Sequence, residues 1–472
     1  MCSEEGRNTD LKKFALVLSV ILMMTIISPI TAHATEQISE DELNSYIQTE
    51  FEKTHVPAMS VAIVDTDNVE FIGNYGDCES ADTPFILGSI SKSFTAVAIM
   101  QLVEQGKINL DEPMSAYLPE ADQSSKTTVK QLLHHTSGIH TYMTLENYSS
   151  SDTVTGYEYA NVNYNLLGLI VEQASGASYA DYLKANIFTP LGMTSSYTSL
   201  YEAKTDGLID GNRNCFGIMY PDEYIYPTKM TSGWMTAASA YIISTANDMG
   251  KYLQFYLNGG NDVLSSQSME LMYNDTVSVQ ENYEYGYGLG IDKTSGVTIL
   301  THGGNVENYT TYMFLLPESD KAAIVLTNAC DFFVSNDMVI QTAYNIAYKL
   351  LAMPTSDIGD STYMTTHLVI NAILLFIAIT AILPLFFLKK WRSINKGNIR
   401  ISSILCTTFI HIFVPTLLLL VPKVFSATMW VAARFAPDVF WVLIISSLLL
   451  YLAGIYKIVF YIRTNISKRQ NQ

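Results

Sequence analysis

The pattern of apolar and polar residues divides the chain into three parts. An apolar run without acidic or basic residues occupies positions 14–34, and three runs of about 20 mainly apolar residues lie near the C-terminal end, at 368–388, 401–421 and 439–461. Runs of about 20 residues are long enough to cross the hydrocarbon core of a bilayer. The segment between them mixes short alternating and helical patterns, which indicates a folded domain followed by three transmembrane helices.

The N-terminal run has the features of a secretory signal. Lys12 and Lys13 precede it, and Ala32 and Ala34 occupy the small-residue positions of a cleavage site at its end. We therefore predict that residues 1–34 are a signal peptide cleaved after Ala34. An uncleaved N-terminal anchor is the alternative, because the apolar run is long for a signal peptide.

Residues 35–352 are predicted to form one globular domain, with strands near both ends and helices between them. An alternating pattern on both sides of a polar turn predicts a β-hairpin at 57–76. The other predicted strands are 296–301, 309–317 and 322–328, and the predicted helices are 40–53, 89–105, 163–174, 245–257 and 337–353. This order fits one antiparallel sheet completed by the two ends of the domain. A linker, 353–366, precedes the membrane domain, 367–472.

Charge supports this division. Residues 35–366 contain 13 Lys and Arg against 41 Asp and Glu, a net charge of −28, whereas residues 367–472 contain 11 against 1, a net charge of +10. The acidic domain argues against nucleic acid or an anionic lipid surface as its ligand. Lys and Arg cluster after the first and third apolar runs, which is typical of cytoplasmic segments. We therefore predict a multi-pass cell-membrane protein with an extracytoplasmic domain and a cytoplasmic C-terminus.

The cysteines predict neither a disulfide framework nor a metal site. Five are present, and only Cys78, Cys215 and Cys330 belong to the globular domain. The sequence contains no Cys-x-x-Cys pair and no Cys/His cluster with metal-ligand spacing. No metal or other cofactor is predicted.

Ser89 and Lys92 form the first candidate site. They lie three residues apart where a helical pattern begins, and on a helix such positions share one face, with about 5–6 Å between Cβ atoms. A serine becomes nucleophilic when a base accepts its proton, and a lysine does so when its pKa is lowered. Unpaired N–H groups at a helix start can also bind an oxyanion. By itself the spacing is a weak signal, and a plain N-cap role for Ser89 explains it equally well.

Two further segments carry chemically useful side chains. Tyr159 and Asn161 immediately precede a predicted helix, and His302, Gly303 and Gly304 end a predicted strand, where two glycines leave room for a substrate along the backbone. Each has a structural alternative. The phenol can be a surface aromatic, since the chain contains 30 tyrosines, and the imidazole can be a strand-end histidine with satisfied hydrogen bonds.

Taken together, these segments resemble the serine β-lactamase and penicillin-binding-protein superfamily, in its class C-like branch. The S-x-x-K motif, the Tyr-x-Asn motif and the His-x-Gly motif are matched by Ser89 and Lys92, by Tyr159 and Asn161, and by His302 and Gly304. The resemblance extends over about residues 35–351. It implies an α+β fold in which helices flank an antiparallel sheet, with an inserted all-helical lobe and an active site between lobe and sheet.

The resemblance also implies a mechanism. Ser89 attacks an acyl carbon and forms an ester that water later hydrolyses. Either Lys92 or Tyr159 is the principal base, and Tyr159 passes a proton to the departing amine and assists deacylation. Asn161 hydrogen-bonds Lys92 and the amide of the substrate. The backbone N–H groups of Ser89 and Asn305 form the oxyanion hole.

The remaining positions are interpreted through the same resemblance. His302 is expected across the cleft from Tyr159, where it polarises that phenol or meets a substrate carboxylate. His134 and His135 are expected to support the helical lobe. The chain departs from many relatives at Glu307 and Asn308, where a Pro-Gly pair is common, and this departure concerns the shape of the substrate rim.

The predicted function is that of a membrane-anchored serine hydrolase. It would cleave amide bonds in small peptides that contain D-amino acids, of cell-wall type or in a nonribosomal-peptide prodrug. A β-lactamase or esterase of the same fold is the alternative, and a β-lactam-binding sensor without turnover is an alternative of another class. The expected partners are the membrane and a small peptide or peptidoglycan-derived substrate. Nucleic acid is not expected, and no particular oligomeric state is predicted.

Overall fold

The protein is described by a computed structural model. The residues that it describes are 38–120, 126–150, 156–222, 233–396, 399–425 and 427–470. The predicted signal peptide, residues 1–34, lies outside these residues.

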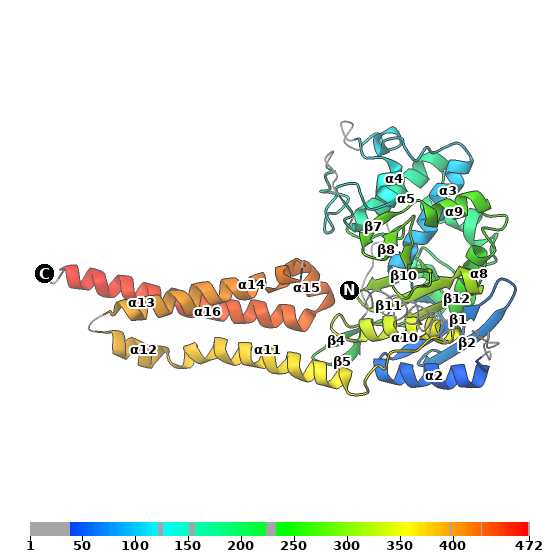
Figure 1. The fold of residues 1–472 in the computed structure, drawn as a ribbon. Coiled ribbons are helices and arrows are strands. Elements are labelled where there is room, and N and C mark those ends of the chain that lie inside the picture. Colours follow the sequence, from blue (N-terminus) through cyan, green and yellow to red (C-terminus); the bar gives the residue numbers. More distant parts are fainter. Residues whose placement is uncertain are drawn as a thin grey trace, which may run out of the picture. The chain divides into compact units, whose positions relative to one another are not determined.

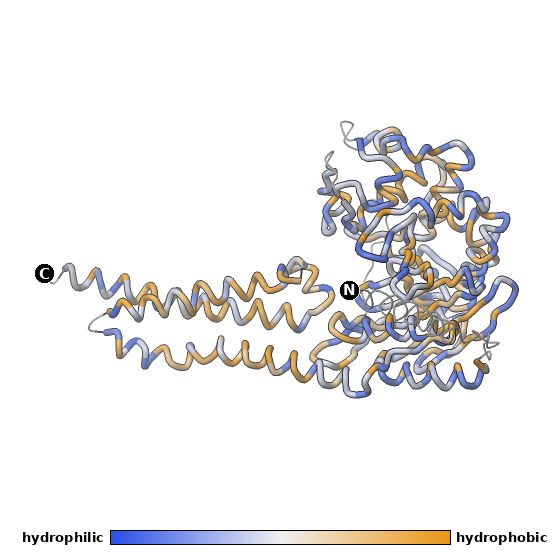
Figure 2. The backbone as a smooth tube through the Cα atoms, in the orientation of Figure 1, coloured by the Kyte–Doolittle hydropathy of each residue, from blue (hydrophilic) through white to orange (hydrophobic). Residues whose placement is uncertain are grey.

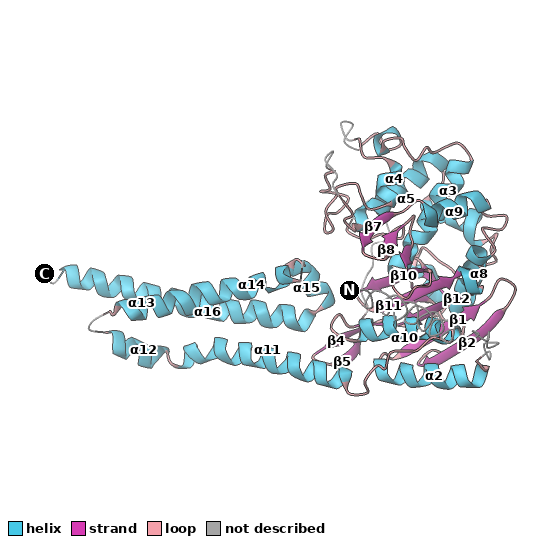
Figure 3. Cartoon of the chain, viewed as in Figure 1, coloured by secondary structure: helices cyan, strands magenta, loops and turns pink. Residues whose placement is uncertain are grey.

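An eight-stranded sheet forms the frame of the globular domain (Figures 1 and 3). Every neighbouring pair in it is antiparallel. In spatial order its strands are β2 (Val69–Gly76), β1 (Ala58–Val64), β12 (Lys321–Thr327), β11 (Tyr309–Leu316), β10 (Ile299–Val306), β9 (Gly290–Asp292), β8 (Tyr283–Tyr285) and β7 (Val277–Gln280). Strand β1 pairs with β12 although the whole helical region separates them in the sequence. The prediction of one sheet completed by the two ends of the domain is confirmed.

Helices cover both faces of this sheet. Every residue of β1 and of β11 is buried, as expected for strands with neighbours on both faces. Helix α2 (Glu40–Thr54) contacts β2, α10 (Ser335–Leu350) contacts β11 and β12, and α8 (Ala246–Leu257) contacts β1 and β12. Their bounds agree with the predicted helices to within a few residues.

The inserted lobe is mainly helical, and it is built around α3 (Ser91–Glu104). Its other elements are η1 (Gly88–Ile90), η2 (Met114–Ala116), α4 (Val129–Leu133), α5 (Asn161–Ser175), α6 (Tyr179–Leu183), η3 (Lys184–Phe188), α7 (Leu200–Thr205) and α9 (Ser266–Asn274). All residues of α3 from Ser91 to Leu102 are buried. A helix that is buried around its whole circumference belongs to the core of a domain. The candidate site lies at the beginning of α3.

Short strands complete the domain. β3 (Phe85–Ile86) pairs with β6 (Ile243–Ser244) just before η1. A three-stranded sheet contains β13 (Ala329–Cys330), β4 (Asn212–Cys215) and β5 (Ile218–Pro221). The turn after β11 is η4 (Pro317–Ser319).

Three helical segments in the C-terminal part are long and apolar enough to span a membrane, and they are coloured as hydrophobic along most of their length in Figure 2. They are α11 (Thr362–Phe386), the continuous segment α13–η5–α14 (Ile401–Thr408, Phe409–Phe413 and Val414–Val424), and α16 (Pro437–Gln470). Two short helices accompany them, α12 (Leu388–Asn395) and α15 (Met429–Phe435). The sequence did not predict α15.

Helix α11 begins inside the segment predicted as a linker, 353–366. The physical reason is contact with the globular domain. Tyr363 donates a hydrogen bond to the Gly217 carbonyl at 3.1 Å, and His367 Nε2 lies 2.8 Å from a carboxylate oxygen of the buried Asp331. These contacts stabilise helical turns that precede the apolar stretch.

The core around α3 makes a stability prediction. Phe94 is fully buried and its ring stacks on Tyr252 with 3.8 Å between centroids. We expect Phe94→Ala to lower the free energy of unfolding by about 3–5 kcal/mol, because it removes buried contacts and leaves a cavity. Urea unfolding of the detergent-solubilised full chain measures this. The control is Phe376→Ala, at an exposed position of α11, and an equal loss in both variants would contradict the prediction.

Candidate active site

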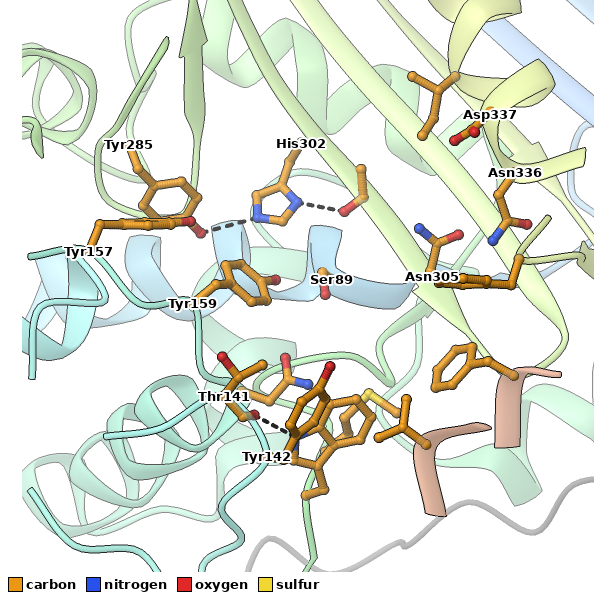
Figure 4. Close-up of a pocket in the computed structure, with 18 of the residues that line it drawn as sticks. Ser89, Thr141, Tyr142, Tyr157, Tyr159, Tyr285, His302, Asn305, Asn336 and Asp337 are labelled. Carbon is orange, nitrogen blue, oxygen red and sulfur yellow. Dashed lines mark hydrogen bonds between the residues drawn. The ribbon is translucent and has the colours of Figure 1, made fainter. Parts of the chain in front are cut away.

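The predicted site residues lie together around one pocket of about 540 Å³ (Figure 4). Ser89, Tyr159, Asn161, His302 and Asn305 all line it. The pocket lies where the beginning of α3, the segment before α5 and strand β10 meet. The structure brings these five residues together, and Lys92 and Gly304 are not among the residues that line the pocket.

Ser89 lies in the short helical turn η1, directly before α3, and not inside the α-helix itself. Lys92 is on the first turn of α3, and its Nζ lies 3.0 Å from Ser89 Oγ. Ser89 is half-buried at the pocket wall, whereas Lys92 is 0% exposed. The local spacing thus places a buried amine directly beneath a hydroxyl that a substrate can reach.

The surroundings of Lys92 favour its neutral form. Burial lowers the pKa of the Lys92 amine well below its usual value. Asn161 Oδ1 accepts a hydrogen bond from Nζ at 2.7 Å, and the Ser239 carbonyl accepts another at 2.8 Å. Both acceptors are uncharged, and among the described residues no carboxylate forms an ion pair with Lys92. A protonated Lys92 therefore has no counter-charge.

The three hydrogen-bond partners of Nζ suit a protonated amine with three donors, and they also suit the neutral form. A neutral amine has two N–H donors and one lone pair. Asn161 and Ser239 take the two donors, and the third contact of Nζ is with Ser89 Oγ. The lone pair is then left for the Ser89 hydroxyl proton. This geometry is the one that a general base requires.

Tyr159 also lies next to the Lys92 amine. Its ring centroid is 4.7 Å from Lys92 Nζ. Burial raises the pKa of Tyr159 well above its usual value, and a hydrogen bond with Ser89 opposes this effect only in part. The phenol therefore remains protonated at neutral pH and is suited to pass on a proton rather than to act as a resting base.

His302 is held in its neutral form. The pKa of His302 is lowered to about 3, mainly by burial and further by the charge of Lys92. Nδ1 lies 2.7 Å from the Gly303 carbonyl and therefore donates to it, so Nε2 accepts a hydrogen bond from the Tyr285 hydroxyl at 3.1 Å. The His302 motif lies within β10, which continues to Val306, and not at the end of a strand as the sequence suggested.

Two glycines allow strand β10 to approach the turn that carries Ser89. A Cβ on Gly304 would lie 2.0 Å from the Leu87 carbonyl oxygen, and a Cβ on Gly88 would lie 2.6 Å from the backbone nitrogen of Asn305. Gly88 also has φ +57°, a conformation that favours glycine. The backbone beside Ser89 and the backbone at Asn305 can therefore pack closely, as an oxyanion hole built from both requires.

His135 supports the second motif, in line with the structural role expected for it. Its Nδ1 accepts a hydrogen bond from the Ala160 backbone nitrogen at 3.2 Å, and its ring lies 4.3 Å from that of Tyr159. His134 Nε2 contacts the Asp275 carbonyl at 2.8 Å, away from the pocket residues. Both histidines thus hold backbone segments in place.

Several pocket residues were missed by the sequence analysis. Tyr157 and Tyr285 line the pocket, as do Trp234 and two residues of α15, Val431 and Phe435. Tyrosines are frequent in this chain and carry no motif, so they gave no signal. The segment around Trp430 in α15 was an available signal, because aromatic residues and an arginine occur there between two apolar runs.

Metal binding has no candidate residues in the described ranges. Within them no group of three or more His, Cys, Asp or Glu side chains is placed to hold a metal ion.

A sequence model of the family described as Beta-lactamase matches residues 43–339, which is more than half of the chain. The chain belongs to the beta-lactamase family. This assignment covers the globular domain, in which all the motif residues lie, and it makes the protein a member of the serine beta-lactamase and penicillin-binding-protein group of hydrolases.

Two relatives illustrate how far the similarity extends. "Protein flp" of Staphylococcus aureus (strain NCTC 8325 / PS 47) is 26% identical over 373 residues, which is 71% of this chain and 73% of that protein. "Penicillin-binding protein 4" of Amycolatopsis lactamdurans is 28% identical over 322 residues, or 59% of this chain and 83% of that protein.

Solved structures show the same fold. The octameric penicillin-binding protein homologue from Pyrococcus abyssi has a TM-score of 0.59 and 26% identity, covering 69% of this chain and 79% of that one. A class C beta-lactamase has a TM-score of 0.56 and 19% identity, covering 68% and 98%. The D-amino acid amidase from Ochrobactrum anthropi SV3 has a TM-score of 0.56 and 21% identity, covering 66% and 99%.

The close packing of Gly304 can be tested directly. We expect Gly304→Ala to slow acylation of Ser89 by roughly 100-fold, in the range observed when an oxyanion-hole donor is lost, because the new Cβ pushes β10 away from the turn at Leu87. Stopped-flow measurement with a chromogenic cephalosporin reports the rate. Gly156→Ala is the control, because a Cβ there meets open space. A Gly304→Ala protein that reacts as fast as the control would show that this approach is not needed.

Proposed function

We propose that this protein is a membrane-anchored serine hydrolase that cleaves amide bonds of small peptides containing D-amino acids, through an acyl-enzyme on Ser89. The observation that carries the proposal is the buried amine of Lys92, whose Nζ lies 3.0 Å from Ser89 Oγ. In the described part of the chain, this amine forms no ion pair with a carboxylate. A surface serine and lysine with the same spacing would lack both the lowered pKa and the adjacent pocket.

In the proposed acylation step, Lys92 is the base. Its pKa is lowered by burial whereas that of Tyr159 is raised, so at neutral pH the amine is the group that can accept a proton from Ser89. Ser89 Oγ bonds to the carbonyl carbon of the substrate as its proton moves to Lys92. The amide C–N bond then breaks.

The departing amine needs a proton, and Tyr159 supplies it in this proposal. Tyr159 lies beside Lys92 and retains its proton at rest, so it can donate to the leaving nitrogen while Lys92 restores its proton. Deacylation uses the same groups in the opposite direction, with water in place of the amine. Asn161 keeps Lys92 in place through Oδ1, and its Nδ2 group is left to donate to the substrate.

The neutral state of His302 limits what it can do. With a pKa of about 3 it carries no charge at neutral pH, so it attracts a substrate carboxylate only weakly. The other expectation is that His302 polarises Tyr159. Its hydrogen bond is with Tyr285, whose ring centroid lies 6.3 Å from that of Tyr159, so in this proposal His302 acts on Tyr159 through Tyr285. We assign His302 as a positioning residue.

The preference for D-amino-acid peptides is supported by similarity and by the pocket. Solved structures with the same fold include the D-amino acid amidase and a D-stereospecific amidohydrolase from Streptomyces sp.. The pocket combines few polar groups with aromatic walls, as sites for small organic ligands do. A β-lactamase activity of the same site is the second candidate, and the class C beta-lactamase structures favour it.

Anchoring in the cell membrane is supported by the three apolar helical segments. The Lys and Arg residues of α12 follow the first of them, and Arg463 lies near the end of the third. Cytoplasmic segments are rich in Lys and Arg, so this distribution supports a globular domain outside the cytosol. The C-terminus would then be cytoplasmic.

The nucleophile is tested by substitution. Ser89→Ala should abolish both acylation by benzylpenicillin, seen as an adduct by intact mass, and release of p-nitroaniline from D-alanyl-p-nitroanilide, because no other described group replaces the hydroxyl. An unchanged far-UV circular dichroism spectrum shows that the fold remains. Activity retained in this variant would overturn the proposal. A wild-type protein that holds one equivalent of drug and never releases product would be a sensor instead.

The base is tested by pH. Acylation should fall as the pH drops through the lowered pKa of Lys92, because the protonated amine cannot accept the serine proton, and it should reach a plateau above that pKa. His302, with its pKa of about 3, titrates below this range. We expect Tyr159→Phe to lower the plateau and leave the midpoint of the acid limb in place. A limb that disappears in Tyr159→Phe would assign the base to the tyrosine.

A further inference from the structure

The pocket wall includes residues from outside the family domain. Helix α15 (Met429–Phe435) lies between the second and third candidate membrane spans, well beyond the matched residues 43–339. Its residues Val431 and Phe435 line the same pocket as Ser89. Both are apolar and half-buried.

Polar contacts attach this helix to the sheet side of the domain. Arg434 Nε lies 2.8 Å from a carboxylate oxygen of Glu307, which is 1% exposed in the turn between β10 and β11. Arg213 of β4 donates a hydrogen bond to the Arg434 carbonyl at 3.1 Å. At the start of α16, a carboxylate oxygen of Asp438 accepts from the Phe216 backbone nitrogen at 2.8 Å. Glu307 is also the position at which the sequence departs from many relatives.

The Glu307 contact couples α15 to the catalytic backbone. Burial raises the pKa of Glu307, and the positive charge of Arg434 opposes this rise. A buried carboxylate is costly without its counter-charge. Because Glu307 follows Asn305 by two residues, the same ion pair that holds α15 also fixes the turn next to the proposed oxyanion hole.

Aromatic contacts attach α15 to the lobe side. The ring of Trp430 meets that of Trp234 edge-on at 4.9 Å between centroids, and Phe435 lies 6.4 Å from Trp234. Tyr142 contacts both Trp234 and Trp430, at 5.9 and 6.0 Å. Trp234 and Tyr142 also line the pocket. The helix is therefore fixed to both of the regions that enclose the site.

The position of α15 relative to Ser89 indicates which part of the substrate meets it. In Figure 4, Tyr159 and Asn305 lie on opposite sides of Ser89. Tyr159 donates to the leaving amine in the proposed mechanism, so the leaving group departs on that side. The acyl part then extends toward Asn305, which precedes by two residues the Glu307 that binds Arg434 of α15.

We propose that α15 forms an apolar subsite for a hydrophobic group on the acyl part of the substrate. The inference rests on the proposed function and specifies its substrate class as D-amino-acid amides whose amino group carries an aromatic or aliphatic cap. Phe435 and Val431 contact the cap, and Arg434 is a positioning residue that holds the wall in place through Glu307.

Two pairs of probes test the subsite in the full-length, detergent-solubilised protein. Each pair differs only by a phenyl group: N-phenylacetyl- against N-acetyl-D-alanyl-p-nitroanilide for turnover, and benzylpenicillin against 6-acetamidopenicillanate for acylation. We expect kcat/KM, and the second-order acylation rate constant, to be roughly tenfold higher for the phenyl member, the scale set by one apolar group in a pocket. A ratio near one in both pairs overturns the proposal.

A substitution in α15 tests whether this helix causes the preference for the phenyl-bearing probes. Phe435→Ala should reduce the tenfold ratio to about two, mainly through a higher KM for the phenylacetyl anilide, since the lost contact is with the cap. The matched control is Phe387→Ala, at an exposed position of the membrane domain that is not part of the pocket lining. If both variants change the ratio alike, or neither does, α15 is not the subsite.

A third variant separates positioning from general destabilisation. Arg434→Gln should reduce the ratio as Phe435→Ala does, and adding Glu307→Gln should restore part of it, because the buried carboxylate is no longer left unpaired. A loss of both reactions in all proteins, wild type included, would instead overturn the proposed function. Reaction of the wild type with all four probes at equal rates within each pair would leave that function standing and remove only the subsite.

Discussion

The burial of one amine without a counter-ion is the constraint on which this active site depends. Lys92 is enclosed by α3, α5 and the segment at Ser239, and its partners are an amide oxygen, a carbonyl and a hydroxyl. The neighbouring titratable groups follow the same rule: burial lowers the pKa of His135 and His302, and raises that of Tyr159. The site is thus a set of neutral polar groups. In the proposed mechanism the proton of Ser89 moves to Lys92, and it does not stay there because the buried site disfavours a charged amine.

Close backbone packing between distant segments provides the second requirement. Gly88 and Gly304 lack the two Cβ atoms that would separate η1 from β10, and strands β11 and β9 pair with β10 on its two sides. The Thr311 hydroxyl adds a hydrogen bond to the Leu87 carbonyl at 2.7 Å. The proposed nucleophile, Ser89 in η1, and the backbone amide of Asn305 in β10, more than 200 residues later in the chain, are thereby held close together.

The parts of this site that depend on local spacing were predictable from the residues alone. The approach of distant motifs, such as Asn161 to Lys92, was expected only from the family resemblance, and other long-range contacts were not predicted. The i, i+3 relation of Ser89 and Lys92 and the alternating strands at both ends of the domain are properties of short segments, so the sequence revealed them. The hydrogen bond between Tyr285 and His302, the support of Ala160 by His135, and the ion pair of Arg434 with Glu307 join segments from separate elements. The early start of α11 has the same origin, since Tyr363 and His367 are stabilised by partners in the globular domain.

The ion pair between Arg434 and Glu307 joins the membrane domain to the globular domain, so the complete pocket needs both of them. A soluble fragment that ends before the first apolar helix would keep every motif residue. It would, however, lack Arg434, the ion-pair partner of the buried Glu307, and the two α15 residues that line the pocket. Assays on such a fragment would describe a broader and less selective catalyst. On this proposal, substitutions in the seven residues of α15, between two candidate membrane spans, can change the preferred substrate. The proposed catalytic residues of the globular domain would not have to change.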